Sequence, residues 1–291
     1  MIERLCIIGV GLIGGSLARA LREAGACQEV VGAGRSADHL QTAVDLGVID
    51  RFETDLARAV AGADMVVVCV PLGAMEAVFA HIKGHLEEHA VLTDAGSAKG
   101  SVIEAAQRAF GQVPACFVPG HPIAGTEQSG VEASFSSLYV DRRVILTPLP
   151  GTVVNATDRV REMWLAAGAQ VVSMDPVHHD AVLAATSHLP HVLAFSLVDT
   201  LSRLDETDEV FDYAAGGFRD FTRIASSDPV MWRDICVANG DAIQLMIEHY
   251  IADLQKVSKA IQNQDGEQLL DTFSRAKAAR DRYIDKQGKT G

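Results

Sequence analysis

The first half of the chain alternates short apolar runs with segments whose apolar residues recur at helical spacing. The apolar runs predict strands at 2–8, 29–33, 65–70, 90–93 and 116–118. The segments between them predict helices near 16–24, 37–46, 74–88 and 98–110, and a strand, helix and strand at 144–147, 153–167 and 170–174 complete this part. Strands that are apolar along their whole length are typical of a parallel sheet covered on both faces by helices.

The second half shows helical patterns and no further strand. Helices are predicted at 177–204, 210–225 and 229–262, with a final helix to about residue 285. We therefore expect an α/β domain at 1–174 followed by an all-α domain at 175–291. The apolar content of these helices favours a homodimer formed through the helical domain. The alternative is that the helices only pack on the first domain.

A glycine-rich turn stands between the first strand and the first helix. Gly9 allows the tight turn, Gly11 lets the backbone approach a pyrophosphate, and Gly14 permits close packing of helix on strand. The helix start also offers free N–H groups to phosphate. This context predicts a Rossmann-type dinucleotide-binding domain. Further cofactor contacts are expected at Leu12, Ile13 and Val70.

The end of the second strand bears on which dinucleotide binds. NAD sites usually carry Asp or Glu there to bond the ribose 2′-hydroxyl. Gly34 occupies that place here, and Arg35 and Ser36 follow, which suit a 2′-phosphate. The sequence therefore predicts NADP as the preferred cofactor with NAD as a second one. The alternative is that Arg35 is an ordinary solvated residue of the turn.

Composition and charge narrow the class of protein. The 291 residues are 48% hydrophobic, and 25 Lys and Arg against 38 Asp and Glu give a net charge of −13. An acidic chain without a basic block is a poor binder of nucleic acid or of anionic membranes. The five cysteines form no C-x-x-C pair, which fits a reducing cytoplasm. Apolar runs such as 65–72 fall short of the ~18 residues of a membrane helix, and no cleaved signal is visible near Glu3.

Three clusters of polar residues carry candidate chemistry. The first, 94–100, and the second, 120–127, each follow a predicted strand, and the third lies in the helical half at 187–191, 216–223 and 232–234. Ligands of such folds bind at the carboxyl ends of the strands. Histidine accepts protons near pH 7, and arginine binds carboxylates through two parallel hydrogen bonds.

The clusters together resemble one family in matching order. They read G-H-P-I-A-G-T-E at 120–127, T-S-H-L-P-H at 186–191 and F-R-D-F-T-R at 218–223, followed by Trp232. From the glycine loop to about residue 240, the chain resembles the prephenate/arogenate (cyclohexadienyl) dehydrogenases of tyrosine biosynthesis. The resemblance implies an NAD(P)-dependent oxidative decarboxylation, in which hydride leaves C4, the C4 hydroxyl loses its proton and carbon dioxide leaves C1. Prephenate and L-arogenate both stay open as substrates.

The resemblance also implies roles for single residues. His121 would bond the substrate hydroxyl with help from Ser97, which also lies near the cofactor. Arg223 would clamp the ring carboxylate, and His191 would contact the side-chain carboxylate. Further pocket residues are expected at Thr126, Glu127, Arg219, which would form an ionic network with Asp220, and Trp232, which we expect near Arg223.

Other histidines and one lysine have competing interpretations. His188 is expected to be structural, and Lys99 to be either a cation near the cofactor phosphates or a surface residue. The four histidines at 178, 179, 188 and 191 suggest a metal site, but we expect none because no carboxylate or cysteine is placed to complete it. The histidines at 81, 85 and 89 are expected on the solvated face of one helix.

Two other functions compete with the family's activity. A different two-domain dehydrogenase acting on hydroxy acids or imines would generally need a catalytic lysine in the helical domain, where Lys256 and Lys259 lie too far along the chain. A non-catalytic dinucleotide sensor would need the glycine loop but not His121, Ser97 and Arg223 together.

Overall fold

The computed structural model describes residues 1–204 and 207–287. The chain forms two compact units, Met1–Ile243 and Gln244–Gly291. The first unit holds both β-sheets and the helices up to the start of the long C-terminal helices, and it contains every residue of the candidate site.

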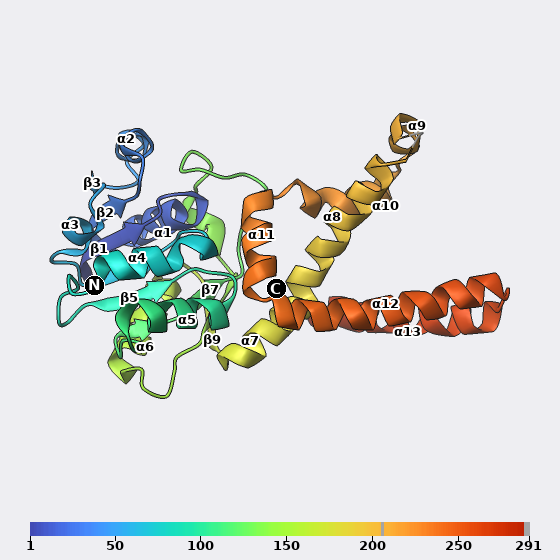
Figure 1. Cartoon of the computed structure of the whole chain (residues 1–291). Helices are drawn as coiled ribbons and strands as arrows, with labels where there is room; N and C mark the ends of the chain where they lie inside the picture. Colours follow the sequence, from blue (N-terminus) through green and yellow to red (C-terminus); the bar gives the residue numbers. More distant parts are fainter. Residues whose placement is uncertain (205–206, 288–291) are drawn as a thin grey trace. The chain divides into compact units, whose positions relative to one another are not determined.

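The first sheet has six strands in the order β3-β2-β1-β4-β5-β6. Its strands are β1 (Ile2–Ile8), β2 (Cys27–Ala33), β3 (Arg51–Glu53), β4 (Met65–Val68), β5 (Val91–Asp94) and β6 (Phe117–Val118), and each pairs in parallel with its neighbours. The connecting helices are α1 (Leu12–Glu23), α2 (Ala37–Asp45), α3 (Leu56–Val60), α4 (Met75–Ile82, after a 3₁₀ turn at Leu72–Ala74) and α5 (Lys99–Phe110) (Figure 1). The strand order reverses between β1 and β4, which creates the ligand-binding crevice of this fold class.

Two separate apolar clusters show why the β1 sequence is apolar throughout. Leu5 and Ile7 belong to the cluster on one face of the sheet, and Cys6 and Ile8 belong to the cluster on the other face. Successive side chains of a strand point to opposite faces, so a strand buried on both must be apolar at every position. The predicted helix-covered parallel sheet is confirmed.

A second sheet has three strands in the order β7-β8-β9, and the sequence pattern missed its first strand. β7 (Gly120–Pro122) pairs antiparallel with β8 (Arg143–Leu146), and β8 pairs in parallel with β9 (Gln170–Ser173). A short 3₁₀ turn, Ser136–Tyr139, and helix α6 (Val154–Ala166) bring Tyr139 and Trp164 into edge contact, with ring centroids 5.0 Å apart. His121 thus lies within a strand and not in a loop after one.

The described elements after β9 are all helices, as predicted, although the single helix predicted over 210–225 is divided into two. They are α7 (Pro176–Leu183), a π-helical turn (Ala184–His188), α8 (Leu189–Ser202), α9 (Thr207–Asp212), α10 (Gly216–Thr222) with a 3₁₀ turn (Arg223–Ser226), α11 (Pro229–Ala238), α12 (Gly240–Gln262) and α13 (Gly266–Gln287). Asp228 starts α11 as an N-cap by accepting the N–H groups of Val230 and Met231.

Two predicted helices end earlier than expected. The single helix predicted over 229–262 is interrupted at Asn239, where α11 ends and α12 begins. The helix predicted over 74–88 stops at Ile82, before Gly84 with φ +78°. The three histidines at 81, 85 and 89 are exposed, but only His81 lies on α4, so they do not share a helix face.

One helical stretch, Pro176–Ser202, is long and apolar enough to cross a membrane by length and composition alone. The expectation concerned uninterrupted apolar runs, and this stretch is interrupted by Asp180, Asp199 and several histidines. Its residues His179, Asp180 and His188 contact His121, Lys99 and Asn239, which belong to other parts of the first unit, as in a packed helix of a folded domain.

Candidate active site

A buried ion pair joins the end of β5 to the start of α5. The Lys99 Nζ donates to Asp94 Oδ2 at 2.5 Å and to the Gly120 carbonyl at 2.6 Å, and both charged side chains are 0% exposed. Asp94 also accepts the N–H groups of Gly96 and Gly120, at 2.7 and 3.1 Å. Burial lowers the pKa of Lys99, while Asp94 and Asp180 oppose that shift. The expectation of a surface residue is wrong, because the Lys99 side chain is buried and anchors β7, and with it His121.

His121 is buried in β7, 8% exposed, and its ring makes an edge contact with a second histidine, His179, with centroids 5.1 Å apart. Its Nδ1 lies 2.9 Å from Nε2 of His179. Burial, reinforced by repulsion from His179, Lys99 and His188, lowers the pKa of His121 well below its usual value. The imidazole is therefore neutral near pH 7, as a general base must be.

Asp180 on α7 completes a chain of hydrogen bonds. Its Oδ1 lies 2.7 Å from His179 Nδ1 and accepts the N–H of Lys99 at 2.8 Å, while Oδ2 accepts the N–H of Gly100 at 2.8 Å. Burial raises the pKa of Asp180, but the hydrogen bonds from His179, Lys99 and Gly100 outweigh it and hold the pKa below its usual range. Asp180 is thus an ionised carboxylate that caps the N-terminus of α5.

The expectation about a metal site needs one correction. A carboxylate does stand beside these histidines, since Asp180 contacts His179 directly. Its oxygens are taken by the imidazole and by two backbone N–H groups. Within residues 1–204 and 207–287, no group of three or more His, Cys, Asp and Glu side chains is arranged to hold a metal ion.

His188 is 1% exposed and is held by Asn239. The Asn239 side-chain amide donates to the Asp180 carbonyl at 2.9 Å and lies 3.1 Å from His188 Nδ1. Burial, reinforced by His179 and His191 and opposed by Asp180, lowers the pKa of His188 to about 4. In the described part of the chain, His188 Nε2 and Trp232 Nε1 are buried without a hydrogen-bond partner. Buried polar atoms of this kind call for a partner from outside the chain, such as water or a ligand.

His191 and Trp232 stack face to face. Their ring centroids lie 3.7 Å apart with an interplanar angle of 19°, and His191 Nδ1 is 2.9 Å from the Ser187 carbonyl. The Trp232 ring also lies edge-on to His188, with centroids 6.1 Å apart. Trp232, expected beside Arg223, is found against these two histidines.

Arg223 forms an ion pair with Glu127, the residue that closes the second cluster. Both side chains are accessible to solvent. Arg219 lies 4.0 Å from the neighbouring Asp220, and both are highly exposed, so this pair is a weak surface contact and not a buried network.

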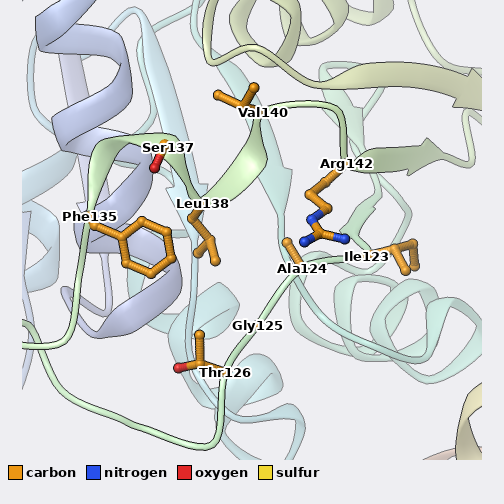
Figure 2. A pocket seen from close by; sticks show the side chains of 9 residues that line it. All are labelled: Ile123, Ala124, Gly125, Thr126, Phe135, Ser137, Leu138, Val140 and Arg142. Atoms are coloured by element: carbon orange, nitrogen blue, oxygen red, sulfur yellow. The ribbon is translucent and has the colours of Figure 1, made fainter. Parts of the chain in front are cut away.

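Thr126 lines a hollow of about 280 Å³ beside the loop that follows His121. Figure 2 shows Thr126, Phe135 and Arg142 around it. Ser97 is half-buried in the loop between β5 and α5, three positions after Asp94. Direct contacts among the predicted substrate-site residues therefore pair His191 with Trp232 and Arg223 with Glu127, while His121 contacts His179, which was considered only for a metal site.

The glycine loop has the geometry that its spacing predicts. Gly9 has φ +97°, and a Cβ there would lie 2.4 Å from the Cys69 carbonyl oxygen. A Cβ on Gly14 would lie 2.3 Å from the Gly9 oxygen, so this helix packs closely on the strand. Gly11, the N-cap of α1, faces open space and offers no side-chain cap. The start of α1 is therefore free to receive an anion, and the loop fits a dinucleotide.

Neighbouring cofactor candidates differ in their environment. Val70 packs beside Gly9, and the Ile13 carbonyl accepts the Tyr139 hydroxyl at 2.6 Å, whereas Leu12 is buried. Arg35 is exposed just beyond β2, and Ser36 caps α2 by accepting the His39 N–H at 3.3 Å.

The domain models of one protein family match nearly the whole chain. The nucleotide-binding domain of prephenate dehydrogenase matches residues 17–173, and the dimerisation domain of prephenate dehydrogenase matches residues 175–275. The chain belongs to the prephenate dehydrogenase family. Its N-terminal part is the nucleotide-binding domain of that family, and the helical part that follows is the dimerisation domain.

Individual relatives are similar to this chain along nearly its whole length. The cyclohexadienyl dehydrogenase of Zymomonas mobilis is 39% identical over 96% of this chain and 95% of its own. Prephenate dehydrogenase of Aquifex aeolicus, solved with hydroxyphenyl propionate and NAD⁺, is 37% identical with a TM-score of 0.89, covering 96% of this chain and 98% of its own. Synechocystis arogenate dehydrogenase is 26% identical with a TM-score of 0.81, covering 97% and 100%.

These findings confirm the resemblance recognised in the motifs. The activity of the prephenate dehydrogenase family, dehydrogenation of prephenate or arogenate (cyclohexadienyl) substrates in tyrosine biosynthesis, is the activity of this chain. The hydroxy-acid dehydrogenase and the non-catalytic sensor are set aside.

From the sequence, Asp180 was not identified as a partner of the site's histidines, Asn239 was not named at all, and His179 was considered only for a metal site. His179 and Asp180 lie within α7, the helix that starts at Pro176, and a histidine next to a carboxylate was a usable signal. Nothing local distinguishes Asn239, whose partners lie 51 and 59 positions away.

The low pKa of His188 predicts that the protein loses stability in mild acid. In the unfolded chain His188 binds its proton near pH 6.5, whereas in the folded chain it binds the proton only near pH 4. Between these values the unfolded state holds more protons, so stability falls as pH drops through this window. We expect the His188 contribution to fall by about 2–3 kcal/mol from pH 7 to 4.5, measured by urea unfolding.

The His188→Gln variant should flatten this pH dependence, because glutamine does not titrate. His85→Gln, at an exposed position, should leave the dependence as it is in the wild type. An equal slope of the unfolding free energy against pH in the wild type and in His188→Gln would show that His188 does not cause this dependence.

Proposed function

We propose that this enzyme oxidatively decarboxylates prephenate, L-arogenate or both, with His121 as the base that takes the C4 hydroxyl proton. One observation carries this role. His121 is buried and neutral, its Nδ1 is engaged by His179, and Nε2 is the ring nitrogen left for a substrate. Ser97, in the loop beside the start of α5, is the proposed assistant on the same hydroxyl.

The proton balance of the reaction suits a buried base. A bound nicotinamide dinucleotide supplies the acceptor for the hydride that leaves C4. His121 Nε2 takes the hydroxyl proton, the C1–carboxylate bond breaks, and its electron pair makes the ring aromatic. The resulting phenolate oxygen takes the proton back from His121. The step releases carbon dioxide with no net gain or loss of protons, so His121 needs no exchange with solvent.

The carboxylates of the substrate require cations or neutral donors in the helical part. Arg223 is the proposed clamp for the ring carboxylate, which would replace Glu127 as its partner. His191, held flat against Trp232, is proposed to contact the side-chain carboxylate. Released Glu127 can then pair with an ammonium, which arogenate has and prephenate lacks. The exposure of Thr126 and Arg219 supports a position at the rim of the substrate site.

The activity test uses both substrates and one base variant. The wild type should reduce the dinucleotide, seen as absorbance at 340 nm, with prephenate, arogenate or both. His121→Asn should lower kcat by about 10²- to 10⁴-fold, the usual contribution of a general base, while the dinucleotide still binds. Absence of turnover with either substrate would contradict the function, and unchanged kcat in His121→Asn would remove His121 from its role.

We further propose that NADP is preferred over NAD, with NAD as a second cofactor. Gly34 offers no carboxylate to a ribose 2′-hydroxyl. The Ser36 hydroxyl serves as a helix cap, so the exposed Arg35 is the group available to a 2′-phosphate.

A single substitution at Gly34 should reverse this preference. A Cβ there would meet only Leu40 side-chain atoms, at 3.7 Å or more, so Gly34→Asp is tolerated. We expect the ratio of kcat/KM for NADP⁺ to that for NAD⁺ to fall at least about tenfold, since the carboxylate repels the phosphate and binds the 2′-hydroxyl. Arg35→Ala should lower the same ratio, and Arg58→Ala, another exposed arginine, should not. A wild-type preference for NAD⁺ that survives Arg35→Ala would refute the proposal.

We also propose that the protein is a cytoplasmic homodimer formed through its helical part. The matched dimerisation domain covers residues 175–275. Exposed apolar side chains on α12 and α13, in the second compact unit, support this: Ile251, Leu254, Ile261, Leu270 and Phe273. Exposed apolar surface of this kind marks an interface. The acidic net charge and five unpaired cysteines fit the cytoplasm.

The double variant Leu254→Asp/Phe273→Asp should be a monomer, because each change places a carboxylate in an apolar interface. Light scattering after size-exclusion chromatography gives the mass. Gln255→Asp, at an exposed polar position next to Leu254, should stay dimeric. A monomeric wild type, or a double variant with wild-type mass, would contradict the dimer.

A further inference from the structure

Three side chains from two distant parts of the sequence form one buried line of hydrogen bonds. Asp180 Oδ1 lies 2.7 Å from His179 Nδ1, and His179 Nε2 lies 2.9 Å from His121 Nδ1. His179 is 0% exposed and His121 is 8% exposed. Each imidazole nitrogen in this line must be either a donor or an acceptor, so the line has a direction.

Asp180 sets that direction. Its carboxylate already accepts two backbone N–H groups at the start of α5, which favours the ionised form, and an ionised carboxylate can only accept. His179 must therefore donate from Nδ1. When His179 is neutral, its Nε2 carries a lone pair, which accepts the proton of His121 Nδ1–H. His121 is left with its lone pair on Nε2, the nitrogen away from His179.

We propose that Asp180 and His179 are positioning residues that fix His121 in the Nδ1–H tautomer and so hold its Nε2 ready to take a proton. This inference rests on the proposed role of His121. During turnover Nε2 binds the proton from the substrate hydroxyl, and His121 becomes an imidazolium with Nδ1–H still donated to His179. The proton leaves Nε2 for the phenolate, so no proton passes to His179 or Asp180.

The surroundings of the line keep it in place. Lys99, Asp94 and His188 are the other charged or titratable groups close to it, and Lys99 is neutralised by its own ion pair with Asp94. Asn239 holds the Asp180 backbone carbonyl, and Asp180 itself caps the helix that follows Ser97. The orientation of the base is therefore tied to the loop that carries Ser97.

Nitrogen NMR of the ¹⁵N-histidine-labelled wild type tests the tautomer without reference to activity. The His121 signals, assigned by their loss in His121→Asn, should show Nδ1 protonated and Nε2 unprotonated near pH 7. Protonation of His121 on Nε2 would overturn the proposal even if the enzyme is fully active. A failed catalytic role for His121 would instead appear as unchanged turnover in His121→Asn.

Variants of His179 test the consequence for rate. His179→Leu removes the acceptor and should lower kcat by about 10²- to 10⁴-fold, the scale of losing a correctly oriented base, with little change in dinucleotide affinity. His179→Gln keeps the direction of the line, because its amide donates to Asp180 and its carbonyl accepts from His121. It should retain kcat within about tenfold of wild type.

The exposed neighbour His178 provides the matched control, and His178→Leu should leave kcat unchanged. Wild-type kcat in His179→Leu, or equal losses in the Leu and Gln variants, would overturn the proposal. If His179→Leu does not fold, the tautomer of the wild type and the activity of His179→Gln still decide it.

Discussion

The buried pair of Lys99 and Asp94 is the interaction on which the site depends. Isolated, either charge would be very costly to remove from water, and the pair is tolerable because hydrogen bonds surround it. Asp94 accepts from Lys99, Gly96 and Gly120, and Lys99 also reaches the Gly120 carbonyl. These bonds fasten the last residue of β5 to the first residue of β7, next to His121. Removal of either partner would leave the other charge buried and unpaired. It would also detach β7, the strand that carries the base.

The starts of two helices along the first sheet, α5 and α1, differ in how their free backbone N–H groups are satisfied. The start of α5 is occupied by the Asp180 carboxylate, whereas the start of α1 at Gly11 has no side-chain cap. Both ends carry the same partial positive charge. The protein thus satisfies one helix end internally and leaves the other for an anionic ligand. In a chain with a net charge of −13, the uncapped start of α1 creates a local binding site for anions, although the overall charge repels them.

The sequence predicted those features that depend on neighbours along the chain. Gly9, Gly11 and Gly14 and the doubly buried strands follow from local spacing, and the structure has them. The motifs also pointed to His121, His191 and Arg223 as the candidate site residues. The line from Asp180 to His121 was missed because its members lie 58 positions apart and meet only through the fold. The surface position considered for Lys99 was wrong for the same reason, since only a folded chain shows that its ammonium is buried.

The π-helical turn at Ala184–His188 decides which way the second half of that helix faces. Nine positions separate His179 from His188, about two and a half turns of a regular α-helix, which would put the two rings on opposite sides. A π turn takes more residues per turn and rotates His188 and His191 back toward the side of His179. Deleting one residue from this turn would let it close as a regular α-helix, whose eight-position spacing turns His188 to nearly the same side. Two lengths of this segment are therefore compatible with one arrangement of the histidines, and spacing alone does not decide whether a relative keeps that arrangement.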